Sequence, residues 1–170
     1  MCNRWPVYHG SVMSGSWASS PAVRRVMQGN RSRDTKPEMA LRRRLHAMGL
    51  RYRVCARPVV DLPRKVDIVF RPARVAVEVR GCFWHGCSEH GRVPSANRDF
   101  WAAKIARNVA RDQDTCRRLT DAGWVLLVVW EHEDVAQAAD RVAKVVRSRR
   151  DTIPPAAGRK PQLRTGNESC

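Results

Sequence analysis

The stretch Val66-Asp67-Ile68-Val69-Phe70, Arg71-Pro72-Ala73-Arg74, Val75-Ala76-Val77-Glu78-Val79 decides the fold. Its first and last segments are rich in β-branched and apolar residues, and the four residues between them include the proline typical of a turn. The stretch therefore predicts a β-hairpin. A hairpin that turns about Pro72 and Ala73 places Asp67 opposite Glu78. Because side chains alternate along a strand, Arg80 projects on the same side as Glu78.

Asp67 and Glu78 are like charges that face each other in the predicted hairpin, which is destabilising unless something compensates them. Mg²⁺ suits this position, because it binds through one or two carboxylates, keeps several waters, and can polarise a phosphodiester while activating the attacking water. Arg80 is then a candidate to clamp a phosphate or to offset charge in the transition state. The alternative is that both carboxylates pair with nearby arginines, and the hairpin alone leaves it open.

Helical and strand patterns continue on both sides of the hairpin. A capping box over Thr35 to Glu38 begins a predicted helix that ends at Gly49. A second helix is predicted from about residue 98 to 122, followed by an apolar strand over 124–130 and a helix over about 133–149. The second helix is expected to turn Trp101, Ile105, Val109, Cys116 and Leu119 inward. With two or three strands before the second helix, this order predicts the α/β class, a small single domain with a central mixed β-sheet flanked by helices.

The composition indicates a partner of negative charge. The 170 residues include 32 Lys and Arg against 16 Asp and Glu, a net charge of +16, which is typical of nucleic-acid-binding proteins and also of ribosomal, heparin-binding and membrane-surface proteins. No apolar stretch approaches the roughly 20 residues that cross a bilayer, and no apolar signal core is present. We predict a cytoplasmic protein without a membrane partner. Its folded domain is expected over residues 23–149, between flexible tails at 1–22 and 150–170.

The cysteines indicate a metal site rather than crosslinks. Six cysteines are too widely spaced for a disulfide framework. Cys82, Cys87 and His90 follow one another at gaps of five and three, and His132 lies beyond the predicted strand 124–130. Two thiolates and two imidazoles suit a tetrahedral Zn²⁺ with no open position, which would make the metal structural. The alternative is that the cysteines pack in the interior and the histidines lie at the surface.

His85 lies inside this cysteine-containing segment and close in sequence to Glu78, which makes it a candidate general acid or base. A further metal ligand or a packing residue is the alternative role. Phe83 and Trp84 beside it, and Trp101 in the next predicted helix, place aromatic rings among basic residues. Exposed rings of this kind can wedge between base pairs or stack on a flipped base, although Trp101 also fits the inward face of its helix.

Five motifs occur in order along the chain. They are Arg33-Asp34-Thr35-Lys36-Pro37-Glu38; Asp61-Leu62-Pro63 through Val66-Asp67-Ile68-Val69-Phe70; Gly81-Cys82-Phe83-Trp84-His85-Gly86-Cys87; Phe100-Trp101-x-x-Lys104-Ile105-x-x-Asn108-x-x-Arg111-Asp112; and Gly123-Trp124 to Trp130-Glu131. Together they resemble the very short patch repair (Vsr) endonuclease family, which has a restriction-endonuclease-like nuclease core. The resemblance covers roughly residues 24–134.

The resemblance implies an enzyme that recognises a T:G mismatch left by deamination of 5-methylcytosine and nicks the thymine strand on its 5′ side. It implies that Asp67 is the principal Mg²⁺-binding carboxylate, Glu38 an acidic active-site residue, and His85 the catalytic histidine. The capping box explains Glu38 equally well. The family's structural zinc falls on Cys82, Cys87, His90 and His132. Its DNA contacts fall on Phe83, Trp84, Trp101, Asn108, Arg24, Arg25, Arg31 and Arg33.

Two positions depart from the family pattern. Val79 and Arg80 stand where family members carry a threonine and a histidine, so a metal contact could survive through the Val79 carbonyl while the role of the histidine is lost. Glu78 restores the more general pattern of an Asp followed by Glu-x-Lys, with Arg80 at the lysine position, where it cannot readily act as a base. Two alternatives stay open, a related nuclease with restriction-type specificity and an inactive zinc-stabilised DNA-binding module. The expected partners are double-stranded DNA and mismatch-repair proteins, and the chain is expected to be a monomer.

Overall fold

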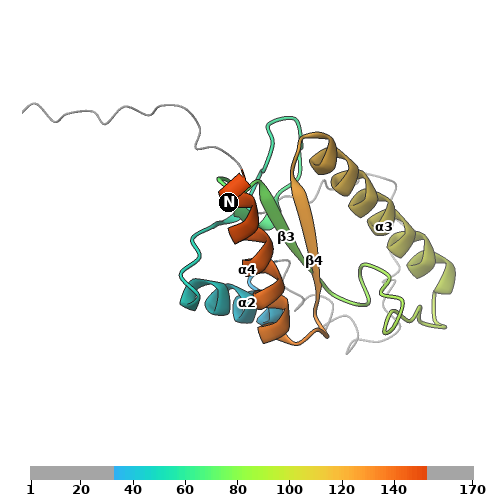
Figure 1. Ribbon diagram of the computed structural model, residues 1–170. Coiled ribbons are helices and arrows are strands. Elements are labelled where there is room, and N and C mark those ends of the chain that lie inside the picture. The colour runs from blue at the N-terminus through green and yellow to red at the C-terminus, as the bar shows by residue number, and fades with distance from the viewer. Residues whose placement is uncertain (1–32, 153–170) are drawn as a thin grey trace, which may run out of the picture.

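The computed structural model describes residues 33–152, which form one sheet and three helices in a layered arrangement (Figure 1). The elements in chain order are α2 (Lys36–Ala47), β1 (Arg53–Ala56), β2 (Val66–Phe70), β3 (Val75–Arg80), α3 (Arg98–Asp121), β4 (Val125–Trp130) and α4 (Val135–Thr152). This order is the one that the sequence predicts. The α/β class and the mixed sheet are therefore confirmed.

The four strands lie in the order β1-β2-β3-β4. β2 runs antiparallel to both of its neighbours, β1 and β3, and β4 runs parallel to β3. In the hairpin, Phe70 pairs with Val75 and Ile68 pairs with Val77, which is the register predicted from the turn. The next positions along the two strands are Asp67 and Glu78. The parallel pairing requires a crossover between β3 and β4, and α3 provides it.

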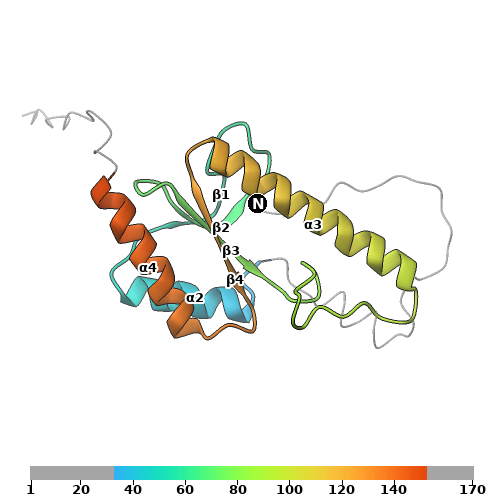
Figure 2. The same ribbon diagram turned by 45° about the vertical axis from the view of Figure 1, so that its right-hand side comes forward.

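The helices cover both faces of the sheet. α3 lies on one side, and α2 and α4 lie together on the other, as the two views agree (Figure 1 and Figure 2). Alternation along the strands follows these layers: Phe70 and Val77 belong to the core beneath α2 and α4, whereas Val69 and Ala76 pack with Leu119 of α3. By the same alternation Glu78 and Arg80 face the side of α3.

The first helix begins as the capping box predicts, with one difference. Thr35 is the N-cap, and its hydroxyl accepts a hydrogen bond from the Glu38 N–H at 3.4 Å. In a capping box the glutamate side chain bonds back to the cap residue itself, but here the Glu38 carboxylate accepts from the N–H of Asp34 at 2.8 Å. The helix stops before Gly49, whose φ of 82° lies in the left-handed region that glycine tolerates best.

Two details of the helices differ from the prediction. Cys116 was expected to face inward from α3, but it is exposed, and Thr115 is buried in its place. The Thr115 hydroxyl donates to the Arg111 carbonyl at 2.8 Å and accepts from Arg64 at 2.9 Å, so this polar residue is buried without loss of hydrogen bonds. α4 begins at Val135 and ends at Thr152, slightly later than expected at both ends.

Among residues 33–152, none of the helices combines the length and the apolar character needed to span a bilayer. The predicted DNA-binding residues Arg24, Arg25 and Arg31 lie outside the described residues, as do the predicted tail 1–22 and residues 153–170 of the other predicted tail. Residues 150–152, expected to begin that second tail, belong to α4 instead.

We predict that Leu45→Ala lowers the free energy of unfolding by about 2–5 kcal/mol, because the fully buried Leu45 side chain fills the space between α2, the sheet and α4. Denaturant titration measures the loss. The neighbouring exposed residue gives the control, since His46→Ala removes no buried contact and should stay within about 0.5 kcal/mol of the parent. Equal stability of the two variants would contradict the layer arrangement.

Candidate active site and Cys/His cluster

Asp67 lies on β2 and is the carboxylate around which the candidate active site is built. Its Oδ2 accepts a hydrogen bond from the backbone N–H of Val79 at 2.8 Å, which ties it to β3. Burial raises the pKa of Asp67 to about 7; the Val79 hydrogen bond and His85 lower it, and the charges of Glu38 and Glu78 raise it further. In the described part of the chain Asp67 has no ion pair. Asp67 is therefore a buried carboxyl whose charged form is supported by one backbone hydrogen bond and by no ion pair among the described residues.

Glu78 and Arg80 pair with each other at the end of β3. The Oε2 of Glu78 accepts from the Arg80 Nη2 at 2.6 Å and from its Nε at 3.1 Å. The Nη1 of the same guanidinium lies 3.7 Å from the Oδ2 of Asp112 on α3. The sequence left open the alternative that both carboxylates pair with arginines. The structure shows this pairing for Glu78 but not for Asp67. Arg80 is held between two carboxylates.

His85 contacts the carboxylate of Asp112, a residue to which the sequence analysis assigned no role. The Nδ1 of His85 lies 2.6 Å from the Oδ2 of Asp112, and the Asp112 side chain is largely buried. Because an ionised carboxylate only accepts, Nδ1 carries a hydrogen, and in the neutral ring Nε2 is the acceptor. The signal available in the sequence was spacing: Asn108 and Asp112 are four residues apart on one face of α3, and they contact the consecutive residues Trp84 and His85.

Glu38 is buried at the start of α2, with 4% of its surface exposed. Its Oε1 accepts from Arg42 at 2.9 Å, and Arg42 also pairs with Asp34. Arg42 was missed by the sequence reasoning, although it stands one helical turn after Glu38, where an ion pair is expected. The charge of Glu38 raises the pKa of Asp67, so the two carboxylates are electrostatic neighbours.

Three aromatic rings form a cluster beside His85. Ring centroids are 4.9 Å apart for Phe83 and Trp84, 5.3 Å for Phe83 and Trp101, and 6.0 Å for the two tryptophans, all edge to face. Phe83 and Trp84 are half-buried, whereas Trp101 is buried at 3% exposure. Phe100, which the sequence reasoning did not select, is 40% exposed and also contacts Trp101. The predicted rings are brought together, and Trp101 forms the base of the cluster.

Two of the remaining predicted DNA contacts lie in the described residues. Asn108 donates from Nδ2 to the Trp84 carbonyl at 2.9 Å, so its amide positions the aromatic segment. Arg33 is exposed and lies 3.6 Å from the carboxylate of Asp34. Lys104, with its ammonium 5.3 Å from the Trp84 ring centroid, adds a cation beside the aromatic cluster.

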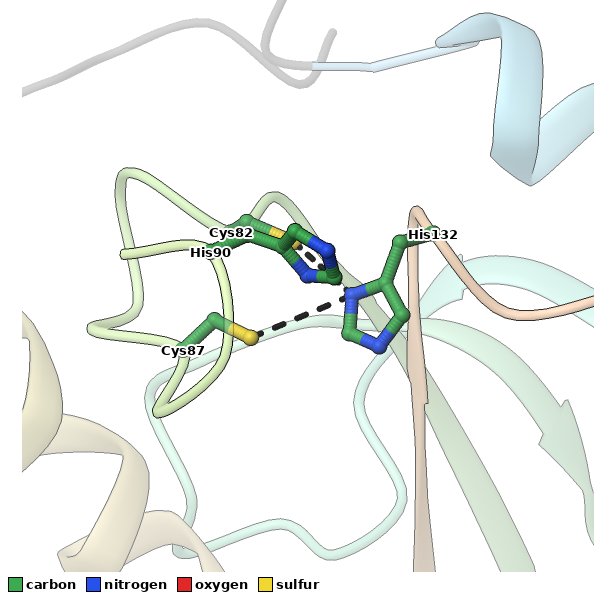
Figure 3. A group of neighbouring side chains, drawn as sticks. All are labelled: Cys82, Cys87, His90 and His132. Atoms are coloured by element: carbon green, nitrogen blue, oxygen red, sulfur yellow. Dashed lines mark hydrogen bonds between the residues drawn. The ribbon is translucent and has the colours of Figure 1, made fainter. Parts of the chain in front are cut away.

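The four predicted zinc ligands come together at the ends of β3 and β4 (Figure 3). The potential ligand atoms of Cys82, Cys87, His90 and His132 all lie within 4.8 Å of one another. The Nδ1 of His132 is 3.0 Å from the Cys82 sulfur and 3.9 Å from the Cys87 sulfur, the spacing of neighbouring ligands around one tetrahedral ion. The Nε2 of His132 faces Glu89 at 3.7 Å. This donor set could hold a metal ion.

Glu131 fixes the backbone where the cluster begins. Its Oε1 accepts from the Cys82 N–H at 2.7 Å, and its own N–H donates to the Arg80 carbonyl at 3.0 Å. These two hydrogen bonds join the segment after β3 to the end of β4. The Cys/His cluster and the active-site residues therefore share one support, with Arg80 and Cys82 separated by a single glycine.

Fold and site together define a small α/β protein with an acidic and histidine-containing centre at one end of its sheet. A family model described as DNA mismatch endonuclease Vsr matches residues 19–90. A Type II nicking enzyme, V.NaeI of Lentzea aerocolonigenes, is 48% identical over 124 residues, which cover 72% of this chain and 73% of the relative. The Type II nicking enzyme V.XorIIP of Xanthomonas oryzae is 44% identical, with coverage of 67% and 83%.

A third relative is the DNA mismatch endonuclease Vsr of Escherichia coli, 37% identical over 62% of this chain and 66% of that protein. With these identities and coverages, the chain belongs to the Vsr endonuclease family. It is a DNA endonuclease, and DNA is its partner.

Proposed function

We propose that this endonuclease nicks duplex DNA on the 5′ side of the thymine in T:G mismatches that arise from 5-methylcytosine deamination. The observation that carries the proposal is the aromatic cluster of Phe83, Trp84 and Trp101, joined directly to the catalytic segment through His85. Rings next to a reacting strand can enter a weakened base step, and a mismatched step costs less to open than a paired one. The relative named DNA mismatch endonuclease supports the same role. We expect a monomer that acts inside the cell and passes its nick to mismatch-repair proteins.

Mg²⁺ would be held by Asp67, with Glu78 and the Val79 carbonyl as further oxygen donors. The donor set fits, because Mg²⁺ needs only one or two carboxylates and fills its other positions with water and substrate. Asp67 and Glu78 each have one carboxylate oxygen engaged by the protein, the Oδ2 by Val79 and the Oε2 by Arg80, which leaves the Oδ1 and the Oε1 for an ion. When bound, the ion would polarise the phosphodiester and activate water.

His85 is placed to act as the general base. Asp112 accepts a hydrogen bond from the Nδ1–H and so fixes both the tautomer and the orientation of the ring. The Nε2 atom would then take a proton from the attacking water. Arg80 is a candidate to bind a phosphate oxygen, for which it would exchange part of its pairing with Glu78. Glu38 adds negative charge that favours a cation at Asp67.

The decisive experiment compares two duplexes that differ only in carrying T:G or C:G at one position. With Mg²⁺, we expect the thymine strand of the T:G duplex to be nicked about 10- to 200-fold faster under single-turnover conditions. Asp67→Asn should abolish nicking and retain DNA binding, which shows that the activity belongs to this site. Equal nicking of the two duplexes would contradict the mismatch role and favour a sequence-specific nicking enzyme, the activity named in V.NaeI and V.XorIIP.

The histidine–aspartate pair makes a second prediction. Asp112→Asn should slow nicking about 10- to 100-fold, because an amide holds the His85 ring less firmly and in no fixed tautomer. His85→Gln should slow it about 10²- to 10⁴-fold, and the Asp112 change should add no further loss in that background. Asp114→Asn, which alters a half-buried carboxylate two residues away that pairs with Arg64 and not with His85, is the control and should keep near-normal rates. Additive losses would show that Asp112 acts independently of His85.

We propose further that Cys82, Cys87, His90 and His132 hold a structural Zn²⁺. Both sulfurs are buried and face the imidazole of His132, and four protein donors leave no position for water or substrate. The ion would join the segment that carries Phe83, Trp84 and His85 to the end of β4. It would therefore stabilise the position of the catalytic histidine without taking part in the reaction.

Elemental analysis of the purified protein should find one zinc ion per chain, and Cys82→Ser should lose the zinc and lower the melting temperature, because structural zinc contributes directly to folding. Cys116→Ser is the matched control, since that thiol is free and exposed on α3, far along the chain from the cluster. A Cys82→Ser protein that keeps a full complement of zinc would refute the ligand set.

A further inference from the structure

A group of arginines lies at the end of the molecule opposite the candidate active site. They are Arg71 and Arg74 in the turn between β2 and β3, and Arg147, Arg149 and Arg150 in the last turns of α4; we call these five residues the rear arginine cluster. Figure 2 shows the C-terminal end of α4 beside the β2–β3 turn, at the opposite end of the sheet from the segment between β3 and α3. Figure 1 shows the same separation.

Tertiary contacts join these arginines into one surface. Arg149 donates from Nε to the Ala73 carbonyl and from Nη2 to the Gly123 carbonyl, both at 2.9 Å. The guanidinium of Arg74 also lies beside Gly123. Two guanidinium groups from different elements therefore meet at one loop. The two hydrogen bonds of Arg149 hold the end of α4 against the start of β3.

Among the described residues, none of these five arginines forms an ion pair. Across residues 33–152, no carboxylate lies within 4.0 Å of any of the five guanidinium groups, including Asp121 and Asp151 on the adjoining helices. Where they donate hydrogen bonds, they do so to backbone carbonyls, as Arg71 does to Arg57 at 2.9 Å. At the catalytic end, by contrast, Arg42 and Arg80 are each bound by two carboxylates.

We propose that the rear arginine cluster binds the phosphate backbone of a second DNA duplex while the active-site end holds the first. Arginine forks match phosphate oxygens in pairs, and four of these five side chains are exposed. Duplex DNA offers a negative charge about every 1.7 Å, so it can engage a turn and a helix end together. Val75 and Arg80, at the two ends of β3, are about 17 Å apart, and the cluster lies at the end of the sheet opposite the active site, so we assign it to a second duplex.

This arrangement would let one chain bridge two DNA segments and pass between them without a full return to solution. The chain is a DNA endonuclease, so DNA is the polyanion that it meets at the highest local concentration. The contacts are electrostatic and sequence-independent, as searching for a rare site requires. The inference depends on the DNA endonuclease activity and not on the T:G specificity, and the mismatch assay above can fail without affecting it.

The test variant is Arg74→Gln/Arg147→Gln/Arg150→Gln. It leaves Arg149 in place and disturbs at most one weak hydrogen bond, from Arg147 to the Met48 carbonyl at 3.5 Å. The control, Arg117→Gln/Arg118→Gln/Arg141→Gln, removes the same charge from exposed arginines that are paired with Asp114 or Glu133. Analytical ultracentrifugation with short matched duplexes at low salt measures how many duplexes each chain binds.

We expect one wild-type chain to bind two duplexes and the control to do the same. The test variant should bind the first duplex normally and the second about 10- to 100-fold more weakly, with a salt slope lower by about 2 to 3 for its three lost contacts. Three results would overturn the proposal: a wild type that binds one duplex only, an equal loss in the control, or a two-duplex complex that contains two chains. A variant that keeps the second duplex but loses binding to vesicles of anionic lipid would assign the cluster to a membrane surface instead.

Discussion

The pairing of β2 with β3 is the constraint on which the rest of the site depends. Phe70 opposite Val75 fixes the register, and a slip of one residue would turn every side chain of one strand to the other face. In the observed register, Asp67 receives its hydrogen bond from Val79, and Glu78 and Arg80 face α3. The buried apolar residues of the hairpin, which are held from both sides by helices, exclude the alternative registers. The position of a polar active site is thus determined by apolar packing.

The sequence predicted the elements, their order and the hairpin register, because each depends on local periodicity. It also predicted the Cys/His cluster, from the short spacing of Cys82, Cys87 and His90 and from the place of His132 at the end of a predicted strand. It did not predict the partners of the charged residues. Asp112 contacts His85 from α3, 27 residues further along the chain; its spacing from Asn108 places both on one helix face but does not identify their partners. Thr115 rather than Cys116 is buried on α3 for a similar reason: Arg64, from a distant loop, donates a hydrogen bond to the threonine hydroxyl. The roles of Asp67 and of the two metals stay predictions.

Arg80 links the two halves of the candidate active site. Its guanidinium contacts Glu78 on β3 and Asp112 on α3, and Asp112 contacts His85, so the four side chains form one continuous polar chain across the end of the sheet. A histidine at this position, as in the family pattern, could not contact both carboxylates with a fork of donors. The substitution therefore exchanges a second imidazole for a rigid connection. Buried networks of this kind hold one geometry when every member is satisfied.

The distribution of charge divides the molecule into two ends. At the catalytic end, Arg42 and Arg80 are bound by carboxylates, and Asp67 is a buried carboxyl without an ion pair among the described residues, whose pKa is raised to about 7. In the rear arginine cluster, Arg149 donates hydrogen bonds to two backbone carbonyls, and the other four arginine side chains are exposed to solvent. A uniform excess of positive charge would attract DNA to every surface and would also repel the Mg²⁺ that we propose at this site. Neutralising the arginines near Asp67 removes that repulsion locally, while the net charge of +16 still attracts DNA to the protein as a whole.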